Sequence, residues 1–288
     1  MRPAALPVPP PMPRRSITEP PPTASLGGEQ VVLDDFDRKF ILFLPAVWQP
    51  ARAGRDVELA IHFHGAPWFA IQEHVRRGLE GPLLVHSPGE GSTIYKESFA
   101  DPARFPHLIG RVEQELASRG LPAGARVARV DVTSYSAGYG AVRELVKQPA
   151  AMALLRRVVL LDSMYGSYDD GTTRPAAEHV DVWVPLARAA MRGEKTFVLT
   201  HSEVQTAPRY ASTAECAAAL LAAVNVPSRV LPRGSLPATL DPEFPLHSRA
   251  DAGRFHVWGY GGADAAAHMT HARHLADVWL ALDAAGAP

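Results

Sequence analysis

Residues 127–147 read VARVDVTSYSAGYGAVRELVK. The apolar residues of 127–132 predict a buried strand, and residues 141–147 have the pattern of a helix. Between them, two small residues, Ser134 and Gly138, stand two positions before and after Ser136. A sharp strand-to-helix turn requires small residues at both places, because larger side chains would collide. The stretch therefore predicts a strand, a tight turn that carries Ser136, and a helix.

The predicted turn gives Ser136 a chemical setting. At a helix N-terminus the amide groups and the helix dipole favour negative charge. A serine there suits a nucleophile, and the N–H of Ala137 would hold an oxyanion. The alternative is that Ser136 only caps the helix, a role that serine often has. The usual first small residue of such turns is Gly, whereas this sequence has Ser134.

Strands and helices alternate along the rest of the chain. The apolar patterns predict strands at 31–33, 40–44, 57–63, 83–85, 158–161, 197–200 and 255–258, and helices at 105–118, 176–191, 212–223 and 265–282. A loop rich in Pro and Gly is expected at 227–253. This alternation after an initial hairpin predicts an α/β fold: a mostly parallel central sheet with helices on both faces and an N-terminal antiparallel hairpin. We expect a Pro-rich flexible tail at 1–28 and a single catalytic domain at 29–288.

A second motif lies at the end of the strand predicted at 57–63. His64 and Gly65 follow this strand, and Ala66 and Pro67 come next. Glycine lets the backbone turn and direct an N–H toward a neighbouring strand end, so Gly65 or Ala66 is a candidate second oxyanion donor. An ordinary turn after a strand is the alternative.

A general base and an acid complete the candidate chemistry. His268 follows the glycine-containing loop after the last predicted strand, and His271 is its fallback one helical turn later. Asp162 directly follows the strand at 158–161 and is our first choice for the acid. Glu203, after the strand at 197–200, is the alternative, and Asp264 lies in the histidine loop itself.

With these residues, the sequence resembles the α/β-hydrolase superfamily of serine esterases and lipases. The resemblance rests on residues 134–138, on His64 and Gly65, and on a late histidine, and it covers about residues 30–286. It implies a Ser-His-acid triad, an oxyanion hole, an acyl-enzyme intermediate, a small-molecule acyl substrate and no cofactor. An acid directly after the sixth strand would be similar to the arrangement in pancreatic-type lipases. The resemblance favours a carboxylic ester but leaves thioesters and amides open.

The composition excludes other classes. The net charge is −1, from 29 basic and 30 acidic residues, and this balance does not indicate nucleic-acid binding. No stretch reaches the roughly 18 apolar residues of a membrane span. Prolines interrupt the apolar residues among the first 30, so we do not expect a signal peptide there, and the compartment stays open. The single cysteine, Cys216, lies in an apolar run, where we expect a buried, inert thiol.

Two rival functions remain at this level. A metal-dependent hydrolase would use the imidazoles of His62 and His64, together with His268, His271 and His274. However, no HExxH motif or cysteine pair is present, and we expect no metal. A non-catalytic binding protein on the same fold is the other rival. No nucleotide-binding glycine motif appears in the sequence.

Overall fold

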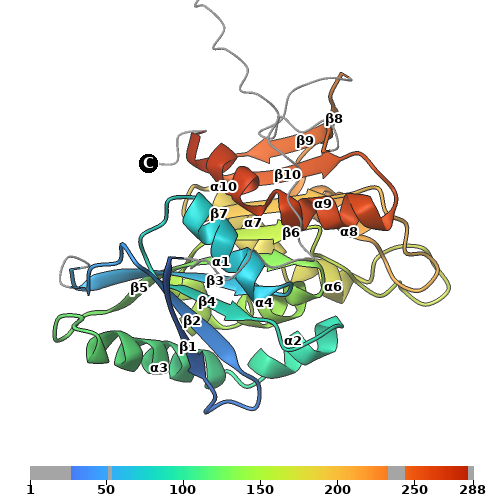
Figure 1. Ribbon diagram of the computed structural model, residues 1–288. Coiled ribbons are helices and arrows are strands. Elements are labelled where there is room, and N and C mark those ends of the chain that lie inside the picture. Colours follow the sequence, from blue (N-terminus) through green and yellow to red (C-terminus); the bar gives the residue numbers. More distant parts are fainter. Residues whose placement is uncertain (1–26, 51–53, 233–243, 285–288) are drawn as a thin grey trace, which may run out of the picture.

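The computed structural model describes residues 27–50, 54–232 and 244–284. Residues 1–26 of the expected tail lie outside the described residues, and so do residues 233–243 of the expected loop. Figure 1 shows one central sheet flanked by helices. Within the described ranges no helix is both long and apolar enough to cross a membrane.

In the part of the chain that the structure describes, the sheet has ten strands, and their order shows how the chain winds through it. Across the sheet these are β1 (Gly28–Leu33), β2 (Phe40–Pro45), β4 (Leu83–His86), β3 (Asp56–Phe63), β5 (Arg126–Tyr135), β6 (Leu155–Leu161), β7 (Thr196–His201), β10 (Phe255–Tyr260), β9 (Leu246–Ala252) and β8 (Arg229–Val230). The strands from β4 to β10 in this order are parallel. β1 and β2 form the predicted antiparallel hairpin, and β2 is antiparallel to β4.

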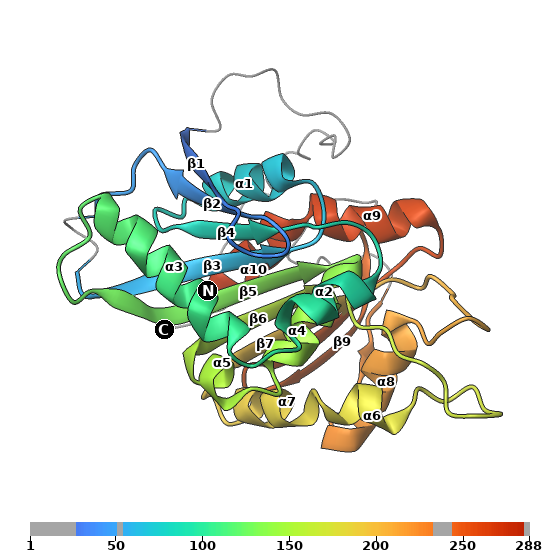
Figure 2. The ribbon, with the colours of Figure 1, turned by 90° about the horizontal axis from the view of Figure 1, so that it is seen from below.

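Helices cover both faces of the sheet (Figure 2). One face carries α2 (Ser92–Phe99), α3 (Arg104–Ser118), α4 (Tyr139–Leu145), α5 (Pro149–Leu154), α6 (Ala177–Asp181), α7 (Val184–Met191) and α8 (Thr213–Val224); the other carries α1 (Pro67–Arg76), α9 (Ala265–Arg273) and α10 (Leu275–Ala284). Side chains of β6 alternate between two cores: Val158 and Leu160 belong to one, and Val159 and Leu161 to the other. Burial on both faces is the reason that β6 has no polar alternation.

The structure corrects three local predictions. The predicted loop at 227–253 contains β8 and β9, and β9 pairs antiparallel with β10. Pro185 in the first turn of α7 lacks an N–H, and the helix expected at 176–191 is divided into α6 and α7. The last helix is divided at His274 into α9 and α10, and the buried carboxylate of Glu73 accepts a hydrogen bond from the N–H of Ala276 in the first turn of α10. The helices α1, α2 and α5 were not predicted.

Candidate active site

The turn after β5 has the predicted form. Ser136 opens a short 3-10 turn, η2 (Ser136–Gly138), which leads directly into α4. Its φ of +46° lies in the left-handed region, a strained conformation for a residue with a side chain. A Cβ on Gly138 would lie 2.5 Å from the carbonyl oxygen of Phe63, so only glycine allows the turn to pack against the end of β3. The strand, tight turn and helix predicted around Ser136 are confirmed.

Ser134, the departure from the usual pattern, is held by a hydrogen-bond chain. Its hydroxyl lies 2.5 Å from the hydroxyl of Ser163, which follows β6 and Asp162. The Ser163 hydroxyl donates to the carbonyl oxygen of Ser136 over 2.7 Å. Ser163 has one proton to give, so Ser134 must be the donor in the first bond. A serine thus fits at position 134 because it is small and because its hydroxyl has a partner.

His268 and Asp162 meet at the same edge of the sheet. His268 lies in the first turn of α9, and its Nδ1 is 2.8 Å from Oδ2 of Asp162. The hydroxyl of Ser202, directly after β7, donates to the same Oδ2 over 2.6 Å, and the N–H of Ser202 donates to Oδ1 over 3.2 Å. The carboxylate of Asp162 is therefore bound on both oxygens. Sequence reasoning missed Ser202; a polar residue directly after a buried parallel strand was the available signal.

The surroundings keep Asp162 ionised. Burial by itself would raise its pKa, because only 2% of the side chain is exposed. Several interactions together outweigh burial and hold the pKa of Asp162 well below its usual range; the hydrogen bond from His268 is the largest of them, and the hydrogen bond from Ser202 adds to it. An ionised carboxylate only accepts hydrogen bonds. His268 must therefore carry its proton on Nδ1, which leaves Nε2 as the basic nitrogen when the ring is neutral.

Two contacts connect this pair with Ser136. The ring of Tyr135, the residue before Ser136, stacks on the ring of His268 with 4.8 Å between ring centroids. Asp162 holds His268 while its neighbour Ser163 holds the Ser136 carbonyl. No described group forms a hydrogen bond with the Ser136 hydroxyl or with Nε2 of His268. Such bonds are often long before substrate binds.

The alternative acids have other partners. Glu203 exchanges two hydrogen bonds with Gly262: its N–H donates to the Gly262 carbonyl over 2.9 Å, and its carboxylate accepts from the Gly262 N–H over 3.0 Å. It thereby holds the loop that leads into α9. Asp264 caps α9 by accepting from the N–H of Ala267 over 2.8 Å.

The fallback base, His271, is deeply buried. Its side chain has 1% exposure, and Nδ1 lies 2.7 Å from the hydroxyl of Thr200. Burial lowers the pKa of His271 to about 3, so this imidazole is neutral. The structure brings His268, and not His271, to the carboxylate of Asp162.

The turn after β3 is anchored at His64. This residue has a φ of +72°, and Gly65 has a φ of +103°. The N–H of His64 donates to the carbonyl of His86 over 3.1 Å, and its Nδ1 lies 2.8 Å from the hydroxyl of Tyr95. Among the described residues, the N–H groups of Gly65 and Ala66 have no hydrogen-bond acceptor. A Cβ on Gly65 would be 3.9 Å from the ring of Tyr135, so this turn lies beside the one that carries Ser136.

The histidines of the metal alternative are engaged separately. Nε2 of His62 bonds to the carbonyl of His64, whereas the His64 ring bonds to Tyr95. No group of three His, Cys, Asp or Glu side chains in the described ranges has an arrangement that could hold a metal ion. Cys216 is fully buried, and burial raises its pKa to about 12, the inert state expected for it.

Two aromatic residues of the segment after β6, Trp183 and Tyr165, differ in burial. Trp183 is in the core and stacks on Phe197. Tyr165 is half-buried and contacts Tyr139 and Tyr210.

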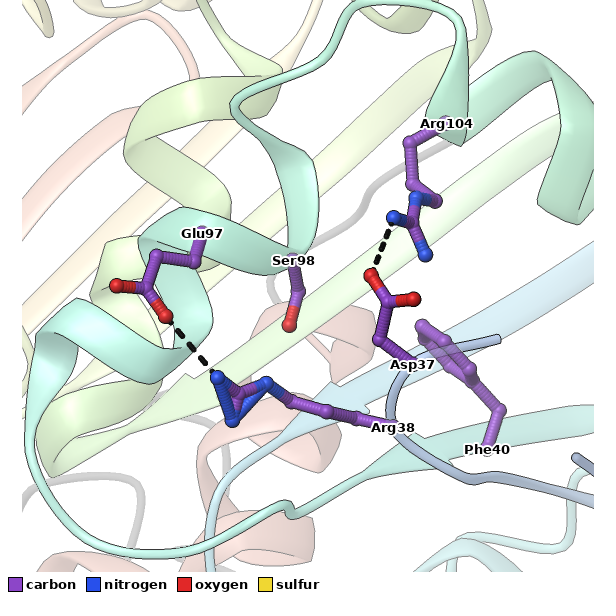
Figure 3. Close-up of a pocket in the computed structure, with 6 residues that line it drawn as sticks. All are labelled: Asp37, Arg38, Phe40, Glu97, Ser98 and Arg104. Atoms are coloured by element: carbon purple, nitrogen blue, oxygen red, sulfur yellow. Dashed lines mark hydrogen bonds and ion pairs between the residues drawn. The ribbon is translucent and has the colours of Figure 1, made fainter.

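A separate pocket lies at the turn between β1 and β2 (Figure 3). It has a volume of about 350 Å³ and is lined by Asp37, Arg38, Phe40, Glu97, Ser98 and Arg104. Two ion pairs, Arg38 with Glu97 at 3.0 Å and Arg104 with Asp37 at 2.7 Å, neutralise its charges. None of the residues predicted for the site lines this pocket.

Comparison with known proteins gives structural similarity only. No protein-family model matches the chain, and no curated protein sequence is significantly similar to it. The chain is similar to native esterase 2 of Thermogutta terrifontis, with 14% identity, a TM-score of 0.49, and coverage of 88% of this chain and 91% of the esterase. It is also similar to the feruloyl esterase module of Clostridium thermocellum (11%, TM-score 0.48, coverage 90% and 92%) and to an S-formylglutathione hydrolase of Agrobacterium tumefaciens (10%, TM-score 0.48, coverage 92% and 98%).

The fold follows from the chain's own topology. The parallel strands β4, β3, β5, β6, β7 and β10, an antiparallel β2, helices on both faces and a strained serine turn after β5 occur together. With this arrangement, the chain has the α/β-hydrolase fold.

Proposed function

We propose that this protein is a serine hydrolase that cleaves an acyl bond, most simply that of a carboxylic ester. The main observation in support of the proposal is the 2.8 Å hydrogen bond between His268 and Asp162, which lies beside the strained turn of Ser136. A nucleophile, a base and an acid then occur in the chain order Ser, Asp, His that this fold uses.

The proposed reaction follows from the properties of these groups. Nε2 of His268 takes the proton of the Ser136 hydroxyl as its oxygen attacks the acyl carbon. The N–H of Ala137 and that of Gly65 or Ala66 stabilise the oxyanion. The C–O bond breaks, and His268 gives the proton to the leaving alcohol. Water, deprotonated by His268, then attacks the acyl-enzyme; the acid is released, and His268 returns the proton to the Ser136 oxygen.

The first test compares wild type with Ser136→Ala on p-nitrophenyl esters of graded chain length. We expect kcat/KM to fall by at least about 1,000-fold in the variant, because no other nucleophile is placed at the turn. A fluorophosphonate probe should label wild type at Ser136 and leave the variant unlabelled. Equal activity in the two proteins would refute the proposal.

The same preparation separates the rival functions. A serine hydrolase should keep its activity in a chelator, whereas stoichiometric zinc and loss of activity on chelation would indicate a metal enzyme. Folded protein that neither hydrolyses esters nor takes up the probe would indicate a binding protein.

A further inference from the structure

Two buried side chains each hold the carbonyl oxygen of a peptide group at the site. The Ser163 hydroxyl donates to the carbonyl of Ser136, and Nε2 of His62 donates to the carbonyl of His64; both distances are 2.7 Å. Ser163 has no exposed surface, and His62 has 5% exposure. From the sequence alone, Ser163 has no expected role, and His62 is a candidate only for a metal ligand.

The direction of these bonds is determined by chemistry. A carbonyl oxygen only accepts, so Nε2 of His62 must carry the proton. Burial lowers the pKa of His62 to about 4, so the ring is neutral and Nε2–H is its single N–H. On the other side, the Ser134 hydroxyl donates to Ser163 over 2.5 Å and leaves the Ser163 proton for the Ser136 carbonyl.

Each held carbonyl shares a peptide group with a proposed oxyanion donor. The carbonyl of Ser136 and the N–H of Ala137 belong to one peptide plane, and the carbonyl of His64 and the N–H of Gly65 to another. Both peptide groups are trans. In a trans peptide the C=O and N–H point in opposite directions. A side chain that holds the carbonyl therefore directs the N–H away from itself.

Both peptide groups follow a strained residue. Ser136 has a φ of +46° and His64 a φ of +72°. Such conformations persist only where the surroundings hold them. Oxyanion donors are effective because their dipoles are already oriented before the reaction. A rotation of either peptide plane would therefore reduce the stabilisation of the transition state and leave ground-state binding unchanged.

We propose that Ser163 and His62 are positioning residues that orient the Ala137 and Gly65 N–H groups toward the oxyanion, an inference that rests on the proposed serine hydrolase function. Ser134 supports Ser163 in this role. The proposal assigns the second oxyanion donor to Gly65 in preference to Ala66, because the carbonyl that His62 holds is in the Gly65 peptide group.

The test uses the full chain with Ser163→Ala, Ser134→Ala, His62→Leu and His62→Gln. Ser163→Ala and His62→Leu should each lower kcat on the order of tenfold with KM near the wild-type value, less than the roughly 100-fold loss of a donor itself. Ser134→Ala should cause a smaller loss. His62→Gln keeps an N–H donor and should recover part of the activity lost in His62→Leu.

Two further readouts exclude a merely structural role. The affinity for an alkylboronic acid, whose adduct with serine mimics the tetrahedral intermediate, should fall by the same factor as kcat/KM. The shape of the pH profile should not change, because the base is untouched. Ser118→Ala is the matched control, since it also removes a hydroxyl that donates to a main-chain carbonyl, that of Glu115 at 2.8 Å, but at the end of α3. It should have wild-type kinetics.

The outcomes are distinct. Wild-type kcat in folded Ser163→Ala and His62→Leu overturns the proposed positioning roles while leaving the serine mechanism intact. If Ser163→Ala does not fold, Ser163→Cys, which keeps the size of the side chain but replaces the hydroxyl by a weak S–H donor, decides for this peptide group, and an unchanged kcat overturns the role of Ser163. A lower kcat in Ser163→Ala but not in His62→Leu refutes the positioning role of His62 and the assignment of Gly65 as the second oxyanion donor. Hydrolysis that survives Ser136→Ala overturns the proposed function and this inference together.

Discussion

At the residue scale, the carboxylate of Asp162 is the best-defined part of the site. It accepts hydrogen bonds from His268 and from Ser202, and it stays ionised although it is buried. An ionised acid at this place fixes the tautomer of His268 and would stabilise its protonated form during the reaction. Glu203, by contrast, is bound to the Gly262 backbone.

The substitutions Asp162→Asn and Glu203→Gln should therefore differ in their effect on kcat. An amide at position 162 cannot offer the same two acceptor oxygens, so the His268 tautomer is no longer fixed and kcat should fall by about 1,000- to 10,000-fold. Glu203→Gln keeps an oxygen for the Gly262 N–H and should remain close to wild type. Steady-state ester hydrolysis measures both. A nearly active Asp162→Asn together with an inactive Glu203→Gln would show that the acid is misassigned.

At the element scale, the contact between the end of β3 and the turn after β5 depends on Gly138. The carbonyl oxygen and Cβ of Phe63 lie 2.5 Å and 2.8 Å from the position of an added Cβ. Main-chain atoms of a central strand cannot move aside easily in a close-packed interior. The turn that carries Ser136 and the strand that leads to Gly65 can therefore pack this closely only because Gly138 has no side chain.

Gly138→Ala should lower the free energy of unfolding by about 1–3 kcal/mol and reduce kcat, because the added methyl group separates the two turns. Gly110→Ala is the matched control: Gly110 lies inside α3, and nothing is within 4 Å of an added Cβ. That substitution should stabilise the protein by roughly 0.5–1 kcal/mol and leave kcat unchanged. Urea denaturation measures the free energy of unfolding of both variants, and ester kinetics measure their kcat. Equal stability of the two variants would contradict the role given to Gly138.

At the scale of the whole molecule, buried neutral histidines make folding sensitive to acid. Burial lowers the pKa of His62, His74 and His86 to about 4, and that of His271 to about 3, from 6.5. Below pH 6.5 the unfolded chain therefore binds protons that the folded protein does not bind. Stability must fall with decreasing pH between about 6.5 and 4, by up to about 3 kcal/mol for each such histidine.

Urea denaturation at pH 7, 6 and 5 should show this decrease. His74→Gln is a suitable variant, because the amide can still donate to the carbonyl of Gly81, the 2.9 Å partner of the His74 ring. Its free energy of unfolding should depend less steeply on pH than that of wild type, since one group that titrates only in the unfolded state is gone. Identical slopes would refute the assignment of His74 to this effect.

Much of the fold could be predicted because its signals are local. The apolar run of β6, the helical spacing of α3 and the small residues around Ser136 each lie within one short segment. β9 was missed because its two buried side chains, Leu246 and Ala250, are separated by three polar residues, so that no apolar alternation marks the strand. The break between α9 and α10 was missed because Glu73, which caps α10, lies on α1.

The sequence by itself determined the serine turn, since the sterics of residues 134–138 permit little else between a strand and a helix. From the sequence alone, His268 and Asp162 could only be preferred among several candidates for the general base and the acid. The tertiary structure decided which histidine meets which carboxylate, because the partners come from α9 and from the end of β6, far apart in the chain. It also decided why Ser134 can replace glycine: the partner of its hydroxyl, Ser163, is brought to it by the parallel pairing of β5 with β6.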